Sequence, residues 1–155
     1  MPKTNAIRIL ESKSISFQTF DYEVSDDDLT GESVAIKIVA DPDLVFKTLV
    51  GRGDKSGLVV FCIPVTGELD LKKAAIASGN KKVEMIKQKE LLPLTGYVRG
   101  GCSPIGMKKL FPTYIDETAR LFDKIYFSAG VRGTQVFMSP DDLRNIIDGE
   151  YADLI

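Results

Sequence analysis

The sequence contains no histidine and no tryptophan among its 155 residues. Without an imidazole, the chain cannot form a Ser-His or Cys-His nucleophile pair, bind zinc through histidine, or use histidine as an acid or base. Any chemistry therefore depends on lysine, tyrosine, carboxylates, hydroxyl groups, backbone amides or a group that the substrate itself supplies.

Cysteine is also scarce, and long apolar runs are missing. The two cysteines, Cys62 and Cys102, lie 40 positions apart. Two cysteines are too few for a disulfide framework, and they lack partner residues for a zinc site, so we expect both thiols to be reduced. No apolar run approaches the roughly 18 residues of a membrane helix, and charges throughout the first residues argue against a signal peptide. We expect a cytoplasmic protein with no membrane partner, no cofactor and no metal.

The composition that remains is typical of a folded protein. The chain has 44% apolar and 27% charged residues, with 13 glycines and 7 prolines. A chain of this length can bury a core without the help of disulfides or a structural metal. Since we find no repeat, low-complexity tract or linker, we expect residues 1–155 to form a single domain.

The charged residues are distributed unevenly along the chain. A net charge of −2 argues against a general nucleic-acid binder and against DNA as a partner. From Lys72 to Lys109, nine basic residues stand against only Glu84 and Glu90, which gives +7. The rest of the chain, with 11 basic and 20 acidic residues, carries −9 and includes the run Asp26-Asp27-Asp28. This segregation predicts a side that faces a polyanion; the alternative is a set of solvated lysines on helix surfaces.

Hydrophobic periodicity and turn residues predict both helices and strands. Four helices are predicted: one that follows a cap at Thr4, two that span residues 33–41 and 69–78, and one that begins at Ser139-Pro140. A weaker helical pattern at residues 81–92 is interrupted by Pro93. Predicted strands span residues 17–22, 45–50, 57–65, 113–116, 124–128 and 134–138, and the second and third should pair across a loop. The expected fold is an α+β domain with a curved, mixed, largely antiparallel and barrel-like sheet flanked by helices.

Lys47 is the first candidate functional residue because it interrupts an apolar strand. Alternation places its side chain on the face opposite Phe46 and Thr48. A lysine there could bind a phosphate or stabilise a developing oxyanion as a point charge. The alternative is that Lys47 simply occupies the polar face of a half-buried strand.

The glycine-rich segment at residues 100–106 is the second candidate. Its three glycines can bring backbone N–H groups close to a ligand, although an ordinary tight turn has the same composition. Neither standard phosphate-binding motif is present. Cys102 lies within this segment, but the lack of a histidine base favours a passive thiol over covalent catalysis. Residues 128–133 could flank a ligand or form only a hairpin connection.

Seven separated segments carry a further signal: Tyr22 and residues 46–49, 69–73, 81–85, 95–97, 100–109 and 128–133. Together they resemble the YbaK/EbsC family, which comprises bacterial Cys-tRNA(Pro) deacylases related to the editing domain inserted in prolyl-tRNA synthetase. The motifs occur in matching order from about Thr4 to Ile155. The resemblance implies the fold of the YbaK and prolyl-tRNA synthetase-associated domains.

The resemblance also implies a function, which is trans-editing of the aminoacylated 3′ end of tRNA. Prolyl-tRNA synthetase mischarges its tRNA with cysteine, and the editing protein removes the cysteine, with the synthetase as a further expected partner. In relatives, the thiol of the cysteine substrate is proposed to attack its own ester carbonyl, giving a cyclic thiolactone and free tRNA. This mechanism agrees with the absence of histidine, because such a site needs mainly to position the ester and polarise its carbonyl.

Matching the family motifs to this sequence assigns roles to individual residues. Lys47 corresponds to the essential lysine that engages the tRNA terminus, and residues 100–104 correspond to a Gly-x-x-x-Pro loop that holds the aminoacyl-adenosine end. The expected catalytic residues are Lys47, Gly100 and Gly101. The expected substrate-binding residues are Tyr22, Thr48, Cys102, Ser103, Pro104, Ser128, Gly130, Arg132 and Gln135.

Two positions depart from the family pattern. Gln135 stands where characterised relatives have an acidic pocket residue, and Leu29-Thr30 replaces an aromatic residue. Loss of a carboxylate weakens recognition of an α-ammonium group, so these changes bear on which amino acid is removed. Two alternatives therefore stay open: a deacylase for another small amino acid, such as alanine on tRNA(Pro), and a non-catalytic regulatory module that binds tRNA.

Overall fold

The computed structural model describes residues 3–25 and 27–155, so Met1, Pro2 and Asp26 of the acidic run lie outside the described residues. The strands are β1 (Gln18–Asp21), β2 (Phe46–Gly53), β3 (Gly57–Pro64), β4 (Val83–Met85), β5 (Thr113–Asp116), β6 (Ile125–Ser128), β7 (Thr134–Met138) and β8 (Glu150–Ala152). The helices are α1 (Asn5–Ser12), α2 (Gly31–Lys37), α3 (Leu71–Ser78), α4 (Gln88–Thr95) and α5 (Pro140–Ile146), with short 3-10 turns η1 (Pro42–Leu44) and η2 (Glu117–Leu121).

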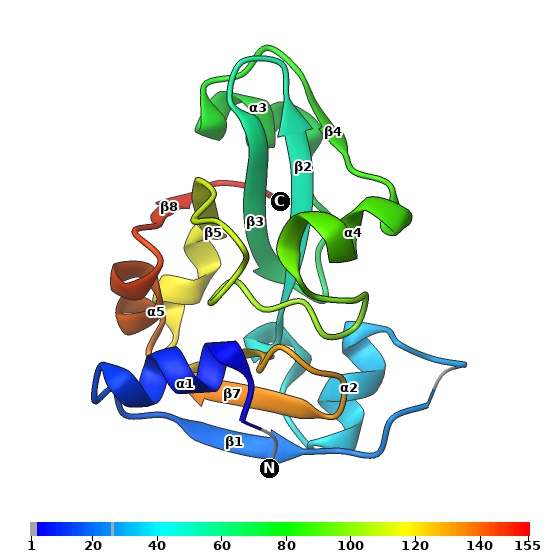
Figure 1. The fold of residues 1–155 in the computed structure, drawn as a ribbon, viewed down its shortest axis with the longest axis vertical. Helices are drawn as coiled ribbons and strands as arrows, with labels where there is room; N and C mark the ends of the chain where they lie inside the picture. The colour runs from blue at the N-terminus through cyan, green and yellow to red at the C-terminus, as the bar shows by residue number, and fades with distance from the viewer. Residues whose placement is uncertain (1–2, 26) are drawn as a thin grey trace.

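The strands form two sheets, which Figure 1 shows in the upper and lower halves of the molecule. The larger sheet has the order β4-β2-β3-β5-β8 and combines antiparallel with parallel pairs, and the smaller one has the order β1-β7-β6. A parallel bridge between Val45 and Tyr126 joins them. The predicted α+β class is confirmed.

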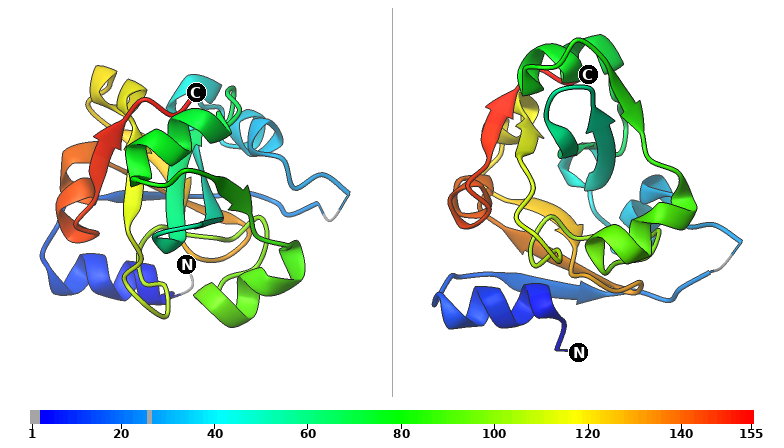
Figure 2. Two further views of the ribbon diagram at one scale, coloured as in Figure 1. Left: turned by 90° about the horizontal axis from the view of Figure 1, so that it is seen from above. Right: turned by 45° about the horizontal axis from the view of Figure 1, so that its top comes forward.

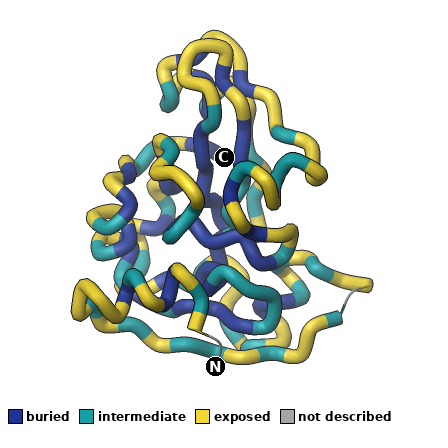
Figure 3. The backbone as a smooth tube through the Cα atoms, viewed as in Figure 1, coloured by how far each residue is buried: buried dark blue, intermediate teal, exposed yellow. Residues whose placement is uncertain are grey.

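Two main apolar cores hold the elements together. One is built around Phe127 and Ile115, with Ile7 and Leu10 of α1 and Leu143 of α5 packed into it. The other lies between the larger sheet and α3. Figure 3 shows the buried backbone concentrated along the central strands, with the helices half exposed. The spacing of apolar residues in the sequence therefore identified most of the inward-facing positions.

The hairpin of β2 and β3 was predicted from two apolar runs and is confirmed. Its register pairs Lys47 with Ile63 and Thr48 with Cys62, and it ends at Gly53 and Gly57. At the tip, the carboxylate of Asp54 accepts hydrogen bonds from the backbone N–H groups of Lys81 and Lys82. These bonds fasten the following chain to the hairpin and lead it into β4.

The helix predicted over residues 81–92 is wrong for residues 81–87 and confirmed for residues 88–92. Val83 and Met85 instead pair with the β2 edge at Gly53 and Gly51, and only then does α4 begin. Residues 83–85 form a strand despite their helical propensity, because the unpaired edge of β2 offers hydrogen-bond partners to their backbone. Helix α4 continues two residues beyond Pro93 and ends at Gly96, whose φ of 87° suits a left-handed cap. The short strand β8 was not predicted.

Helices α2 and α4 lie on the same side of the molecule and flank β2 (Figures 1 and 2). Helix α2 can approach the end of β3 because Gly31 has no side chain: a Cβ there would lie 2.1 Å from Cγ1 of Val65. The helix is shorter than the predicted span 33–41, since Val39 adopts a φ of 55° and breaks the helical path. Within the described ranges, no helix is long and apolar enough to span a bilayer.

Candidate functional site

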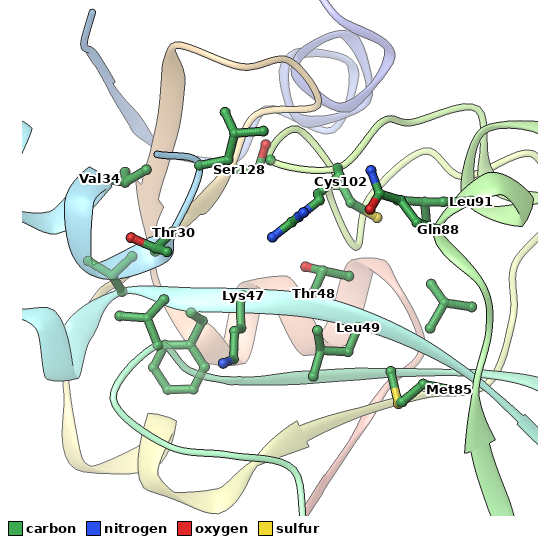
Figure 4. Close-up of a pocket in the computed structure, with 18 of the residues that line it drawn as sticks. Thr30, Val34, Lys47, Thr48, Leu49, Met85, Gln88, Leu91, Cys102 and Ser128 are labelled. Atoms are coloured by element: carbon green, nitrogen blue, oxygen red, sulfur yellow. The ribbon is translucent and has the colours of Figure 1, made fainter. Parts of the chain in front are cut away.

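A pocket of about 470 Å³ lies along β2, between α2 and α4 (Figure 4). Helix α2 and the residues before it form one end, β2 forms the floor, and the β4–α4 segment forms the other end. The loop after α4 and the facing ends of β6 and β7 complete the lining. The lining residues are Leu29, Thr30, Gly31, Glu32, Val34, Val45, Phe46, Lys47, Thr48, Leu49, Val50, Val65, Met85, Ile86, Lys87, Gln88, Leu91, Arg99, Gly100, Cys102, Ser128 and Gln135.

Strand β2 divides this lining into two chemically different sides. In Figure 4, Thr48 lies on the side of the strand that carries Ser128 and Cys102, whereas the amino group of Lys47 and the Leu49 side chain lie on the other side. The alternation of strand side chains explains this arrangement, and it agrees with the predicted position of Lys47 opposite Thr48. The side of Thr48 therefore carries the polar side chain of Ser128 and the thiol of Cys102, and the other side combines a cation with apolar surface.

The Cys102 thiol lies in the wall of the pocket and is 8% exposed. Burial raises its pKa to about 12, and burial likewise raises the pKa of Cys62 to about 12. Both groups are therefore protonated thiols at neutral pH, which makes them poor nucleophiles and unsuitable general bases. Cys102 therefore contributes a neutral thiol, not a thiolate, to the pocket wall.

The loop that carries Cys102 is held firmly from two sides. Arg132 donates from Nε to the carbonyl oxygen of Arg99 at 2.7 Å, and the Tyr97 hydroxyl donates to the carbonyl oxygen of Ile105 at 2.6 Å. A Cβ on Gly101 would lie 3.0 Å from the backbone nitrogen of Arg132, so the loop and the β6–β7 turn are in close backbone contact. The loop is therefore a fixed part of the pocket wall.

Two backbone N–H groups of this loop remain available to a ligand. The N–H of Gly101 donates to the carbonyl oxygen of Val98 at 3.0 Å. Across the described residues, no backbone carbonyl accepts from the N–H groups of Gly100 and Cys102, and both residues line the pocket. Gly100 adopts a φ of 81°, which glycine tolerates best.

Ser128 and Gln135 stand directly opposite each other on β6 and β7, and both line the pocket. The Ser128 oxygen accepts a hydrogen bond from the N–H of Gly130 at 3.2 Å, which leaves the hydroxyl hydrogen free to donate. Gln135 is only 5% exposed, and its Oε1 has no hydrogen-bond partner among the described residues. An unsatisfied buried acceptor costs about 1–3 kcal/mol, so its position beside a pocket points to a ligand that donates to it.

Replacing Gln135 by methionine is expected to raise the free energy of unfolding by about 1 kcal/mol, because the unpartnered oxygen is removed while most of the side-chain volume is kept. Chemical denaturation measures this change. The same replacement at exposed Gln18, on the neighbouring strand β1, serves as the control and should leave the stability unchanged. A loss of more than about 1 kcal/mol at position 135 would contradict the assignment of Oε1 as unpartnered.

The structure gathers six of the predicted site residues into the pocket and places the other six outside it. The six in the lining are Lys47, Thr48, Gly100, Cys102, Ser128 and Gln135. The six outside are Tyr22, Gly101, Ser103, Pro104, Gly130 and Arg132. Ser103 is fully buried and its hydroxyl oxygen accepts from the N–H of Ile105. Pro104 lines a separate cavity of about 340 Å³.

Two of the outer residues contact the pocket lining. Gly130 has a φ of 97° and packs against the ring of Tyr97, and its N–H donates to the Ser128 oxygen. Arg132 donates to the carbonyl oxygen of Arg99. The Tyr22 N–H donates to the carbonyl oxygen of Gly133 at 2.8 Å, and the amino group of Lys37 lies 6.0 Å from the Tyr22 ring centre. These contacts of Tyr22 lie outside the pocket lining.

Sequence reasoning missed the contributions of α2 and α4. The α2 end brings Thr30, whose hydroxyl oxygen accepts from the N–H of Ser33 and caps the helix, together with Glu32 and Val34. The α4 end brings Met85, Ile86, Gln88 and Leu91. Only the departure noted at Leu29-Thr30 gave a signal for the first group. In the second group, Met85 and Ile86 lie where the prediction of a helix is wrong, whereas Gln88 and Leu91 lie in the confirmed part of that helix and belong to no motif.

The charged residues of the lining are three cations, Lys47, Lys87 and Arg99, and one carboxylate, Glu32. Such a set suits a ligand that carries phosphate and also an ammonium group. The residues described contain no group of three or more histidine, cysteine or carboxylate side chains able to hold a metal ion. The pocket can therefore bind, orient and polarise a ligand, but it offers neither a thiolate nor an imidazole.

Comparison with known proteins identifies this architecture. The sequence profile of the aminoacyl-tRNA editing domain matches residues 29–146, which include every residue of the pocket lining. The chain belongs to this family. The resemblance to YbaK/EbsC proteins is confirmed, and with it the expectation of an enzyme that edits aminoacyl-tRNA.

Two curated relatives and two solved structures support the assignment. EbsC of Enterococcus faecalis, named as a candidate Cys-tRNA(Pro)/Cys-tRNA(Cys) deacylase, is 48% identical over 152 residues, which cover 98% of this chain and 93% of EbsC. YwhH of Bacillus subtilis, an uncharacterised protein, is 25% identical over 74% of this chain and 72% of its own. A candidate trans-editing enzyme for prolyl-tRNA synthetase superposes with a TM-score of 0.84 at 24% identity, covering 99% and 98% of the two chains. The hypothetical protein APE2540 superposes with a TM-score of 0.88 at 18% identity, covering 97% and 99%. These structural matches show the same fold.

Proposed function

We propose that the protein is a trans-editing deacylase that releases mischarged cysteine from tRNA(Pro), with the substrate thiol as the nucleophile. The naming of EbsC, at 48% identity, supports the substrate. The observation that carries the mechanism is a pocket whose thiol has a pKa raised to about 12, in a chain without histidine. Such a pocket favours a substrate that brings its own nucleophile.

The two sides of β2 suggest how the substrate lies. The terminal ribose and its phosphate would sit against Lys47, with the adenine over the apolar surface of Leu49 and Met85. The aminoacyl group would extend to the side of Thr48, where Ser128 and Gln135 would accept or donate hydrogen bonds. The lysine would then act on the tRNA terminus while neutral groups contact the amino acid.

The reaction follows from this pose. The substrate sulfur attacks the ester carbonyl, a C–S bond forms, and the C–O bond to the ribose breaks. The thiol proton passes to the departing ribose oxygen, so the products are a cyclic thiolactone and tRNA with a free hydroxyl. The N–H groups of Gly100 and Cys102 would point at the carbonyl oxygen and stabilise its developing negative charge. The rest of the rate enhancement would come from the pocket holding the substrate sulfur close to the ester carbonyl.

A panel of charged tRNA(Pro) substrates tests the proposal. Cysteinyl-tRNA should lose its amino acid at least about 100-fold faster than the S-methylcysteinyl, alanyl and seryl forms, because only the free thiol is a positioned nucleophile of sufficient strength. Loss of the ester is measured by acid-gel separation of charged from uncharged tRNA. The uncatalysed hydrolysis of each ester is the control.

Two other outcomes of this experiment would indicate a different function. Rapid cleavage of the alanyl ester would remove the substrate-thiol mechanism and identify a deacylase for another small amino acid. Binding of tRNA without cleavage of any ester would identify a regulatory module. A deacylase of the proposed kind would work in the cytoplasm beside prolyl-tRNA synthetase, which produces its substrate.

A further inference from the structure

The positively charged segment from Lys72 to Lys109 does not form a single surface. Lys81 and Lys82 are fastened by their backbone N–H groups to Asp54 at the tip of the β2–β3 hairpin. Lys72 and Lys73 lie on α3 at the same end of the molecule (Figure 1). Since β2 rises about 3.3 Å per residue, this tip is roughly 20 Å from Lys47.

Ion pairs also neutralise part of the charge at the tip. Lys73 pairs with Asp153 at 3.1 Å, and Lys82 pairs with Glu84 at 2.8 Å. The cations at the tip are therefore both distant from the pocket and partly compensated. They are poorly placed to contact a ligand whose end lies in the pocket.

A second group of cations stands at the mouth of the pocket. Lys87 and Arg99 line it, Lys89 is exposed in the first turn of α4, and Arg132 is bound to the carbonyl oxygen of Arg99. Within residues 3–25 and 27–155, none of these four side chains takes part in an ion pair. Their charge is available to a partner.

The opposite rim of the pocket, at α2, is acidic. Glu32 lines the pocket there, and Asp28 accepts hydrogen bonds from the N–H and hydroxyl of Thr30. These bonds keep the pKa of Asp28 below its usual value, so it stays ionised. Lys37, at the end of α2, donates to the carbonyl oxygen of Glu23 and lies over the ring of Tyr22. A polyanion that enters the pocket is thus attracted at one rim and repelled at the other.

We propose that the acceptor stem of the tRNA leaves the pocket across the N-terminal turn of α4 and the loop at Arg99, with Lys87, Lys89 and Arg132 contacting its phosphates. This inference rests on the proposed function, because it takes the pocket as the site of the aminoacylated end. Within the basic segment, it assigns Lys87, Lys89 and Arg99 beside α4 to RNA binding and leaves the four lysines at α3 and the hairpin tip to solvent.

Two lysines form a matched pair for the test. Lys89 is the second residue of the eight-residue helix α4, and Lys72 is the second residue of the eight-residue helix α3. Both are exposed. A carboxylate in the first turn of a helix is favoured by the helix dipole, so K89E and K72E should both fold. The two variants change net charge equally and differ only in location.

Binding of uncharged tRNA(Pro) is measured at several salt concentrations for the full-length protein and the two variants. K89E should weaken binding at least about threefold and reduce the slope of log K against log salt by about 0.7–0.9, as expected for the loss of one phosphate contact. K72E should match the unmodified protein in both quantities. The K87N variant should also weaken binding, and asparagine can cap α4 where lysine cannot, which separates binding from stability.

Equal weakening by K89E and K72E would overturn the proposal, because it would show a diffuse charge effect. An unchanged salt slope in K89E would overturn it as well. Because uncharged tRNA is the probe, the result does not depend on deacylation. Failure of the proposed function would appear separately, as intact cysteinyl ester in the presence of the unmodified protein.

Discussion

Replacing Lys47 by methionine is expected to reduce the release of cysteine from tRNA(Pro) by at least about 100-fold, since loss of a single preorganised charge contact at a reacting group typically has this effect. Lys47 is the only charged residue of β2 in the pocket lining. Methionine keeps the apolar stem and removes the ammonium group. The measurement is single-turnover deacylation with saturating enzyme.

The fold should survive this substitution. Lys47 is half-buried, and in the described part of the chain it belongs to none of the ion pairs, so no partner is left behind without its charge. K55M, at the exposed tip of the same hairpin, is the control and should retain full activity. Undiminished turnover by K47M with a normal melting temperature would remove Lys47 from the mechanism.

Replacing Gly130 by alanine is expected to lower the free energy of unfolding by about 2–5 kcal/mol, which combines two costs. The first is a φ of 97°, a conformation that a residue with a Cβ resists. The second is steric, because the new Cβ would lie 2.8 Å from Cε1 of Tyr97. Tyr97 in turn donates to Ile105 in the pocket loop, so activity should fall together with stability.

Gly79 provides the matched control for this prediction. It has a φ of 72°, and a Cβ there would have nothing within 4 Å. G79A should therefore show only the conformational cost, about 1–2 kcal/mol. Thermal unfolding distinguishes the two, since each kcal/mol lowers the melting temperature by about 2–4 °C in a chain of this size. Equal shifts in G130A and G79A would show that Tyr97 yields to the added methyl group.

Much of the secondary structure was predictable because local signals agreed with one another. Thr4 and Ser139 cap α1 and α5 as the sequence indicated, and Pro140 follows the second cap in the first turn. Gly79 ends α3 in the left-handed conformation. Each of these signals involves neighbouring residues, so no knowledge of the tertiary structure was required.

The elements that were missed depend on partners far away in the sequence. Strand β4 exists because Gly51–Gly53 present an unpaired edge, and β8 exists because β5 does. Each is only three residues long, too short to show a period of its own. For the same reason, β4 replaces the first part of the helix that was predicted over residues 81–92.

The candidate site was predictable only in part. The lysine of β2, the glycine loop, Ser128 and Gln135 were recognised from motifs, and the structure brings them into one pocket. Ser103 and Pro104 belong to the same motif but are turned into the interior. Adjacent residues of a tight loop point in different directions, so a motif alone does not distinguish lining residues from supporting ones.

By itself, the sequence determined which chemistry is available: with no histidine, catalysis by imidazole is excluded whatever the fold. The tertiary structure alone decided which groups meet and in which protonation state. It buried Cys102 and so raised its pKa to about 12, because desolvation opposes the charged form. It also separated the lysines at the hairpin tip from Lys87 and Lys89 at the pocket mouth, because β4 runs along β2 between Lys82 and Lys87.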